Sequence, residues 1–248
     1  MKKHIPNFIT LLNVFCGCVA TVFAVENNIA LAALFVALGI FFDFFDGLTA
    51  RLLKVQSELG LQLDSLADMI TSGLVPGVIM FQLLRTSQTQ GWQVVEYSIE
   101  SQDYTSLSSL LPFFGFIITM ASAYRLAKFN IDQNQTTSFI GVPTPANTLL
   151  IASLPLILLY QHNSLANAII LNQWFLIVLT LLSAFLLNCS IPLFALKFKT
   201  WSFSENKFRY IFLITCLALL MTLHFVAIPF ILLLYILSSF LQRNVDSN

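Results

Sequence analysis

Four aspartates stand close together in an otherwise apolar part of the chain: Asp43, Asp46, Asp64 and Asp68. Asp43 and Asp46 are three residues apart, and Asp64 and Asp68 are four apart, so each pair falls on one face of a helix. An ionised carboxylate in or near hydrocarbon is costly, and acids in such places usually face a polar interior and serve a function. We therefore expect this quartet to be a functional site.

A turn centred near Val55 separates the two pairs. Folding the two helices back on each other about that turn places Asp46 level with Asp64, and Asp43 level with Asp68. Four uncompensated negative charges at one depth would repel strongly, and some would have to protonate unless cations neutralise them. Hard oxygen ligands without thiolate or imidazole suit Mg²⁺, Mn²⁺ or Ca²⁺ rather than zinc. The quartet therefore predicts a site for about two divalent cations that hold the phosphates of a substrate.

The neighbours of the aspartates fit a phosphate substrate. Gly47 and Gly60 have no side chains at positions where a ligand would approach the backbone. Arg51, one helical turn beyond Gly47, carries a guanidinium that can bind phosphate oxygens in a bidentate manner. A transporter that moves ions or protons past the same acids is the alternative that the spacing leaves open.

The elements that carry these residues must lie in a membrane. Of 248 residues, 57% are hydrophobic and 10% are charged, with a mean hydropathy of +0.82, whereas a soluble domain carries about 25% charged residues. Lys+Arg and Asp+Glu both number 12, so no basic excess exists to bind nucleic acid. Long unbroken apolar runs favour helices over a barrel. We expect an all-α, polytopic integral membrane helical bundle that forms a single domain over residues 1–248.

About eight segments are long enough to be membrane spans, since a span needs roughly 20 mostly apolar residues. We interpret the first as a retained helix and not as a cleaved signal peptide. The last run, 210–242, contains 33 uncharged residues, a length that leaves one span or two open. His224 and Pro229 near its centre favour a sharp turn and two spans. The predicted spans are 5–25, 29–50, 62–84, 107–128, 145–161, 168–188, 207–223 and 226–242.

The basic residues predict an orientation. With eight spans and the N-terminus inside, 11 of the 12 Lys and Arg residues fall in inner segments and Arg85 alone falls outside. This agrees with the positive-inside rule, and seven spans would weaken the pattern only slightly. The aspartates then open to the cytoplasmic face. The inner basic residues are Lys2, Lys3, Arg51, Lys54, Arg125, Lys128, Lys197, Lys199, Lys207, Arg209 and Arg243.

The acidic segment follows the pattern D-x2-D-G-x2-A-R-x8-G-x3-D-x3-D between Asp43 and Asp68. It resembles the signature of the CDP-alcohol phosphotransferases, and all eight specified positions match without a gap. The resemblance implies a metal-dependent helical membrane enzyme, in which an alcohol attacks the β-phosphorus of a CDP-linked lipid and releases CMP. It also implies a homodimer.

Further segments are similar to the bacterial members of the family that use serine as the alcohol: 6–17, 124–130, 139–146 and 190–197. This likeness implies CDP-diacylglycerol and L-serine as substrates, phosphatidylserine and CMP as products, and a place among the lipids of the bacterial cytoplasmic (inner) membrane. A sister enzyme that uses glycerol 3-phosphate or inositol phosphate is the nearest alternative. A phosphorylated acceptor should need more basic residues than Arg125 and Lys128.

The resemblance also assigns roles to residues. Asp43, Asp46, Asp64 and Asp68 would bind Mg²⁺ or Mn²⁺, and Asp68 would also be the general base. Arg51 would hold phosphate. The residues expected to make room for the nucleotide or to border its pocket are Gly47, Ala50, Gly60, Asn7, Thr10 and Asn13.

The predicted serine pocket consists of basic and amide side chains. Arg125 and Lys128, at the inner end of the fourth span, are candidates to bind the serine carboxylate or the lipid phosphate, with Asn130 as a polar partner and Asn13 as a further candidate. Plain anchoring of the span at the inner face is the other interpretation of the two basic residues.

Overall fold

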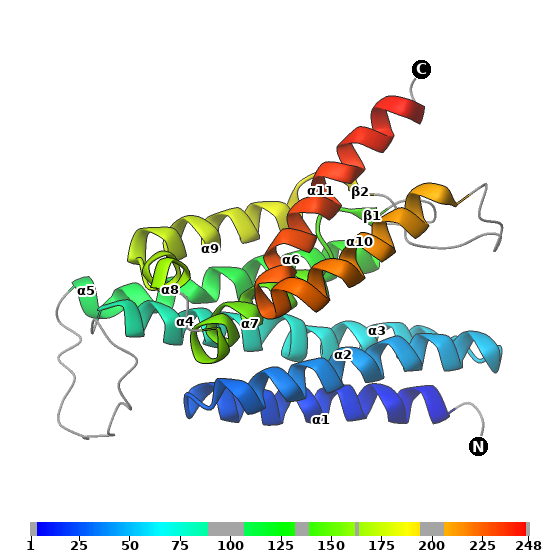
Figure 1. Cartoon of the computed structure of the whole chain (residues 1–248). Helices are drawn as coiled ribbons and strands as arrows, with labels where there is room; N and C mark the ends of the chain where they lie inside the picture. The colour runs from blue at the N-terminus through cyan, green and yellow to red at the C-terminus, as the bar shows by residue number, and fades with distance from the viewer. Residues whose placement is uncertain (1–3, 89–106, 132–138, 162–163, 194–205, 247–248) are drawn as a thin grey trace.

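Two long apolar runs form the first two helices (Figure 1). The computed structural model describes residues 4–88, 107–131, 139–161, 164–193 and 206–246. α1 (Ile5–Val25) has Pro6 in its first turn, where a missing backbone N–H costs no intrahelical hydrogen bond. α2 (Ile29–Leu52) begins after Asn28, whose side-chain oxygen accepts from the backbone N–H of Leu31 at 3.4 Å.

The third rod changes its helical period directly after the second pair of aspartates. The hydroxyl of Ser57 caps α3 (Glu58–Asp68) by accepting from the N–H of Gly60 at 3.1 Å. A π-helical turn, η2 (Met69–Leu74), follows and leads into α4 (Val75–Gln88). Such turns are rare and frequently occur at functional sites. The predicted turn near Val55 is confirmed, because α2 ends before it and α3 begins after it.

The middle of the chain adds shorter helices and a small strand pair that the all-α prediction did not contain. Phe139 pairs with Leu193 and Ile140 with Pro192 in an antiparallel ladder. Pro192 begins β2 and Pro143 follows β1 by three residues, and a proline disfavours the helical conformation in the residue before it. The elements are α5 (Leu107–Leu110), η3 (Leu111–Gly115), α6 (Phe116–Ile131), β1 (Phe139–Ile140), α7 (Thr144–Tyr160), α8 (Ser164–Ile170), α9 (Gln173–Asn188) and β2 (Pro192–Leu193).

Threonines of two neighbouring helices support the π-helical turn. The hydroxyl of Thr148 in α7 donates to the carbonyl oxygen of Ser72 at 2.9 Å, and the hydroxyl of Thr119 in α6 donates to that of Gly73 at 2.9 Å. A widened turn disturbs the regular ladder of helix hydrogen bonds, so these donors compensate for it inside the protein. The turn is therefore fixed by α6 and α7 and not by its own sequence alone.

The final apolar run is divided into two helices, as His224 and Pro229 predicted. α10 (Lys207–Leu223) is followed by η4 (His224–Val226) and α11 (Ala227–Asp246). His224 has a φ of 49°, outside the helical range, and breaks the run there. The chain turns back at η4, and α10 and α11 lie beside each other along part of their length (Figure 1).

The architecture is that of a polytopic membrane protein. Each of the eight predicted spans contains helix in the described part of the chain, residues Leu171 and Asn172 interrupt the span 168–188, and the count of eight spans stays a prediction. By length and composition, four stretches can cross a membrane, or five if the bent pair α8–α9 forms one span, and α7 is a shorter apolar helix. The four stretches are Ile5–Val25, Ile29–Leu52, Glu58–Gln88 and Lys207–Ser239.

Small residues allow the first helices to pack closely. Ala20 and Ala24 of α1 and Ala32 of α2 are fully buried, and α1 packs along α2 and also contacts α3 and η2. Close approach through small residues is the usual way for helices to pack in lipid. The first turn of α1, the α2–α3 turn and the end of α6 consequently meet at one end of the molecule (Figure 1). Lys2, Lys3, Lys197 and Lys199 lie outside the described residues, as does the side chain of Arg243.

Candidate active site

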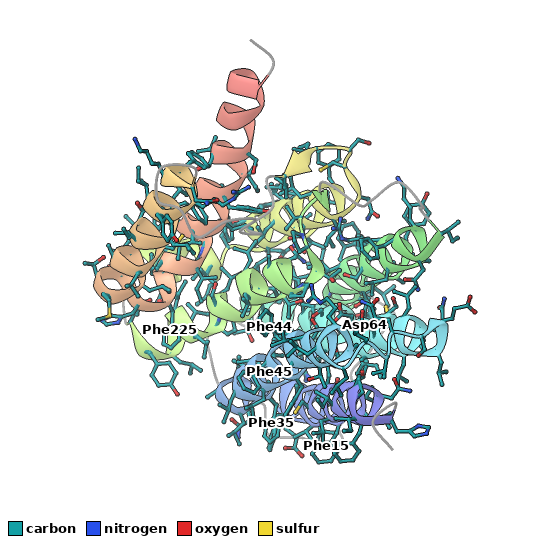
Figure 2. All side chains as sticks on the ribbon, turned by 90° about the vertical axis from the view of Figure 1, so that its right-hand side faces the viewer. Phe15, Phe35, Phe44, Phe45, Asp64 and Phe225 are labelled. Atoms are coloured by element: carbon teal, nitrogen blue, oxygen red, sulfur yellow. The ribbon has the colours of Figure 1, made fainter. Side chains whose placement is uncertain are left out.

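Three of the four predicted carboxylates meet within the reach of one metal ion. Oxygen atoms of Asp43, Asp46 and Asp64 all lie within 4.8 Å of one another. Asp43 interacts electrostatically with each of the other three aspartates, so Asp68 belongs to the same cluster. In Figure 2, Asp64 lies inside the molecule among other oxygen atoms, whereas Phe15 points outward from α1. The antiparallel arrangement inferred from the spacing is therefore present.

The carboxylates face a cavity of about 870 Å³ formed by α1, α2, α3 and the end of α6. Ten of the predicted site residues line it together. The cavity is polar on the side of the aspartates, and Phe44 and Phe129 contribute apolar surface to its wall. The ten residues are Asn7, Thr10, Asp43, Asp46, Gly47, Ala50, Arg51, Gly60, Asp64 and Asp68.

The donor set fits a divalent cation. Asp46 is 5% exposed, and its Oδ2 atom is buried without a hydrogen-bond partner among the described residues. A buried charged oxygen without a partner costs free energy, which an ion in contact with it would offset. Carboxylate oxygens from three side chains within one ion's reach are the ligands that Mg²⁺ and Mn²⁺ prefer.

Arg51 and the two glycines surround the acidic cluster. The Nε atom of Arg51 donates to the carbonyl oxygen of Gly47 at 2.9 Å, so the guanidinium lies over the glycine at the cavity wall. A Cβ atom at Gly60 would meet Asn7 Oδ1 at 3.4 Å and Ser57 Oγ at 3.2 Å. A side chain at position 60 would therefore press on the Ser57 cap of α3 and fill space between α3 and Asn7 at the cavity.

The first helix contributes the remaining polar wall. Thr10 is buried, and its hydroxyl donates to the carbonyl oxygen of Pro6 one turn earlier at 3.1 Å. Asn7 lies on the same wall. Polar groups of α1 thus face the acids of α2 and α3 across a space large enough for a small polar ligand.

Residues 3–186 of this sequence match the CDP-alcohol phosphatidyltransferase family. The chain belongs to this family. The match runs from α1 to residue 186 within α9 and includes every aspartate of the cluster. This CDP-alcohol phosphatidyltransferase is therefore an enzyme of a metal-dependent family, and its acidic cluster can bind a metal ion.

Three curated relatives of this phosphatidyltransferase share the name CDP-diacylglycerol–serine O-phosphatidyltransferase. The Bacillus subtilis protein is 35% identical over 147 residues, which are 58% of this chain and 70% of that protein. The Helicobacter pylori protein (strain 26695) is 31% identical over 148 residues, 59% of this chain and 54% of the relative. The Mycobacterium tuberculosis protein (strain H37Rv) is 27% identical over 152 residues, which are 58% of this chain and 46% of that protein. The chain thus spans about half the length of the last two.

Four predicted residues of the phosphatidyltransferase do not line this cavity: Asn13, Arg125, Lys128 and Asn130. The guanidinium of Arg125 donates to the carbonyl oxygens of Leu187 and Gly141 and so joins α6 to the end of α9. Lys128 is exposed. The predicted contacts of Arg125 and Lys128 with serine stay predictions.

Asn130 holds the end of α6 against α3. Its Oδ1 accepts from the hydroxyl of Ser65 at 2.9 Å, and its Nδ2 donates to Gln62 Oε1 at 3.3 Å. Ser65 follows Asp64 directly, so this contact steadies the element that carries one of the cluster's aspartates. The predicted binding of serine or lipid phosphate by Asn130 remains a prediction.

Several cavity residues of the enzyme were not predicted. Gln56, Ser57 and Glu58 lie in the unspecified part of the acidic pattern, and their place beside the turn near Val55 was the available signal. Phe129 comes from α6, far away in sequence, and no local pattern identifies it. The pattern locates the acids, while long-range packing determines the rest of the wall.

Proposed function

We propose that this enzyme transfers the phosphatidyl group of CDP-diacylglycerol to the hydroxyl of L-serine, giving phosphatidylserine and CMP. The observation that carries the proposal is the meeting of Asp43, Asp46 and Asp64 within 4.8 Å at a cavity that Asp68 also lines. The names of the relatives support serine as the alcohol.

The charge of the cavity also favours serine. Among the described residues that line it, Arg51 is the one basic side chain. A phosphorylated acceptor would add negative charge beside four aspartates and the pyrophosphate, and it would need further cationic groups. Serine adds one carboxylate and carries its own ammonium group, so it makes a smaller demand on the site.

In the proposed site, Asp43, Asp46 and Asp64 hold about two divalent cations, with Asp68 as a further ligand. When bound, Mg²⁺ or Mn²⁺ supplies positive charge that offsets the pyrophosphate and favours departure of CMP. Arg51 binds phosphate oxygens. Gly47, Ala50 and Gly60 leave room for the nucleotide, and Asn7 and Thr10 border it.

Asp68 is the proposed general base. A serine hydroxyl is a weak nucleophile near neutral pH and needs a positioned proton acceptor. Asp68 takes the hydroxyl proton while the serine oxygen bonds to the phosphorus of the phosphatidyl group. The bond from that phosphorus to the CMP oxygen breaks, and CMP leaves with the electron pair.

The proposal places the site at the cytoplasmic face of the bacterial inner membrane, in a chain of eight spans. The α2–α3 turn, the end of α6 and the start of α10 lie at the same end of the molecule (Figure 1). These segments carry Arg51, Lys54, Lys128 and Lys207, and clustered basic residues favour the cytoplasmic side. The family resemblance further predicts a homodimer.

A panel of alcohols tests the proposal. The purified 248-residue chain in detergent, supplied with CDP-diacylglycerol and Mn²⁺, is offered L-serine, glycerol 3-phosphate or inositol phosphate, and CMP release and the lipid product are measured. We expect release of CMP and formation of phosphatidylserine with serine. Transfer to glycerol 3-phosphate or inositol phosphate but not to serine would refute the assignment of the alcohol. Ion flux in vesicles without CMP release would refute the enzymatic role.

A further inference from the structure

Behind the acidic cavity, α1 and the π-helical turn are joined by a buried pair of side chains, Asn13 and Thr71. The hydroxyl of Thr71 lies 2.7 Å from Asn13 Oδ1 and 3.2 Å from the Asn13 carbonyl oxygen. Both residues are fully buried, and neither lines the cavity. This pair is separate from the residues to which the proposed function assigns chemistry.

The Asn13 amide has one free side, and Asp68 lies beside it. Asn13 Nδ2 is buried and makes no hydrogen bond within the described part of the chain. The Asn13 side chain lies close enough to interact with the Asp68 carboxylate. If the amide were turned over, its oxygen would face the carboxylate and two acceptors would repel each other. The contacts with Thr71 and with Asp68 therefore favour the same orientation of the Asn13 amide, in which its oxygen accepts from Thr71 and its amino group faces Asp68.

Two glycines allow the pair to fit between the helices. A Cβ atom at Gly39 of α2 would lie 2.9 Å from Asn13 Oδ1, and one at Gly17 of α1 would lie 3.1 Å from the backbone nitrogen of Thr71. Real Cβ atoms rarely come so close to such atoms, so any side chain at either position would displace the pair. The packing thus leaves Asn13 and Thr71 little freedom to move.

We propose that Asn13 and Thr71 are positioning residues for Asp68. The proposal rests on the proposed function, in which Asp68 accepts the proton of the alcohol. Asn13 donates to one carboxylate oxygen and leaves the other toward the cavity, and Thr71 fixes the amide so that it donates there. Asn13 Nδ2 has no hydrogen-bond partner among the described residues, and catalytic hydrogen bonds often form fully only when substrate is bound. The π-helical turn brings Thr71, three residues after the base, against α1.

The test compares four substitutions, Thr71→Val, Thr71→Ser, Asn13→Ala and Thr180→Val, in the whole 248-residue chain with CDP-diacylglycerol, serine and Mn²⁺. Thr71→Val keeps the volume and removes the hydroxyl, while Thr71→Ser keeps the hydroxyl. Thr180→Val is the matched control, because Thr180 is fully buried and its hydroxyl donates to its own helix, to Leu176, at 2.8 Å. For each variant, kcat, both KM values and the melting temperature are measured.

We expect Thr71→Val to lower kcat by about 10- to 100-fold, because a small misplacement of a catalytic group has effects of that size. The KM for serine should stay within about twofold, since ground-state binding of serine does not use Asp68 as a base. Thr71→Ser should restore most of kcat, and Thr180→Val should leave it unchanged. Asn13→Ala should reproduce the loss caused by Thr71→Val.

Two results would overturn the positioning role. One is a kcat of Thr71→Val equal to that of the wild type. The other is a loss that Thr71→Ser does not restore and that follows the melting temperature, which would mean a purely structural role. The proposed function fails separately: wild-type protein that releases CMP only with another alcohol refutes serine, and the same variants are then compared with that alcohol.

Discussion

The acidic rod, formed by α3, η2 and α4, and the C-terminal pair, formed by α10 and α11, meet the membrane in different ways. In their most apolar stretches, 67% of the residues of the acidic rod are buried in the protein, against 11% for the C-terminal pair. Charged groups in hydrocarbon must be covered by protein or water, whereas apolar side chains can face lipid directly. The rod that carries Asp64 and Asp68 is therefore enclosed by the bundle, whereas α2, which carries Asp43 and Asp46, is 28% buried in its most apolar stretch.

The two regions also contain different cavities. The space between α7, α10 and α11 is about 320 Å³ and is lined mainly by apolar side chains such as Leu149, Ile231 and Leu232. The cavity at the aspartates is larger and contains carboxylates, an arginine and an asparagine. The two cavities differ in their polar side chains. A cavity without such side chains does not by itself indicate a catalytic site. The family match, which ends at residue 186, includes the acidic cavity and not α10 or α11.

Removal of divalent cations should have the largest effect on activity, because it acts on the acidic cavity and not on the apolar one. With EDTA, transfer to serine should fall to the background rate, because Asp43, Asp46 and Asp64 would repel a pyrophosphate without a bound cation. Excess Mg²⁺ or Mn²⁺ should restore it. The measurement is CMP release, with the melting temperature as a control for folding. Full turnover in EDTA would refute the metal site.

Substitution Asp68→Asn should have the next largest effect. It keeps the shape of the side chain and removes the proton acceptor, and a positioned general base contributes about 10²–10⁴-fold to a rate. We expect a loss of that size in kcat, measured as phosphatidylserine formed per enzyme. The variant should melt no lower than the wild type, since one negative charge is removed from a repulsive cluster. Unchanged turnover would show that Asp68 is not the base.

The positions of the aspartates could be predicted because helical periodicity and one short turn determine them. Asp43 and Asp46 share a face through their spacing, and the turn near Val55 is local. The eight helical segments follow from apolar runs between charges, and the break at His224 follows from a run too long for one span.

Contacts between distant segments could not be predicted in the same way. Phe129 reaches the cavity, Thr71 meets Asn13, and Arg125 reaches Leu187 across separations of about 60 residues or more. The π-helical turn after Asp68 depends on hydroxyls of α6 and α7, so its own sequence carries little sign of it. Tertiary packing decides such features.

Substitution of Arg125 should have an effect of intermediate size on stability, because this residue joins α6 to α9 without lining the cavity. Arg125→Met should leave the carbonyl oxygens of Leu187 and Gly141 without this donor, at a cost of about 1–3 kcal/mol in stability. We expect a lower melting temperature and an unchanged KM for serine. A raised KM for serine at an unchanged melting temperature would instead support the predicted contact with the substrate.

The smallest effect is expected on the lipid-facing surface of the C-terminal pair. Leu217 of α10 is 63% exposed, whereas Leu83 of α4 is 1% exposed in the core. Leu217→Ala should change stability by less than about 0.5 kcal/mol, as substitutions outside packed regions usually do. Leu83→Ala should cost about 2–5 kcal/mol through lost contacts and an unfilled cavity. Both are measured as melting temperatures in the same detergent. If Leu217→Ala were as destabilising as Leu83→Ala, protein and not lipid would cover that face. Both regions would then be buried against protein, and exposure to lipid would not distinguish the C-terminal pair from the acidic rod.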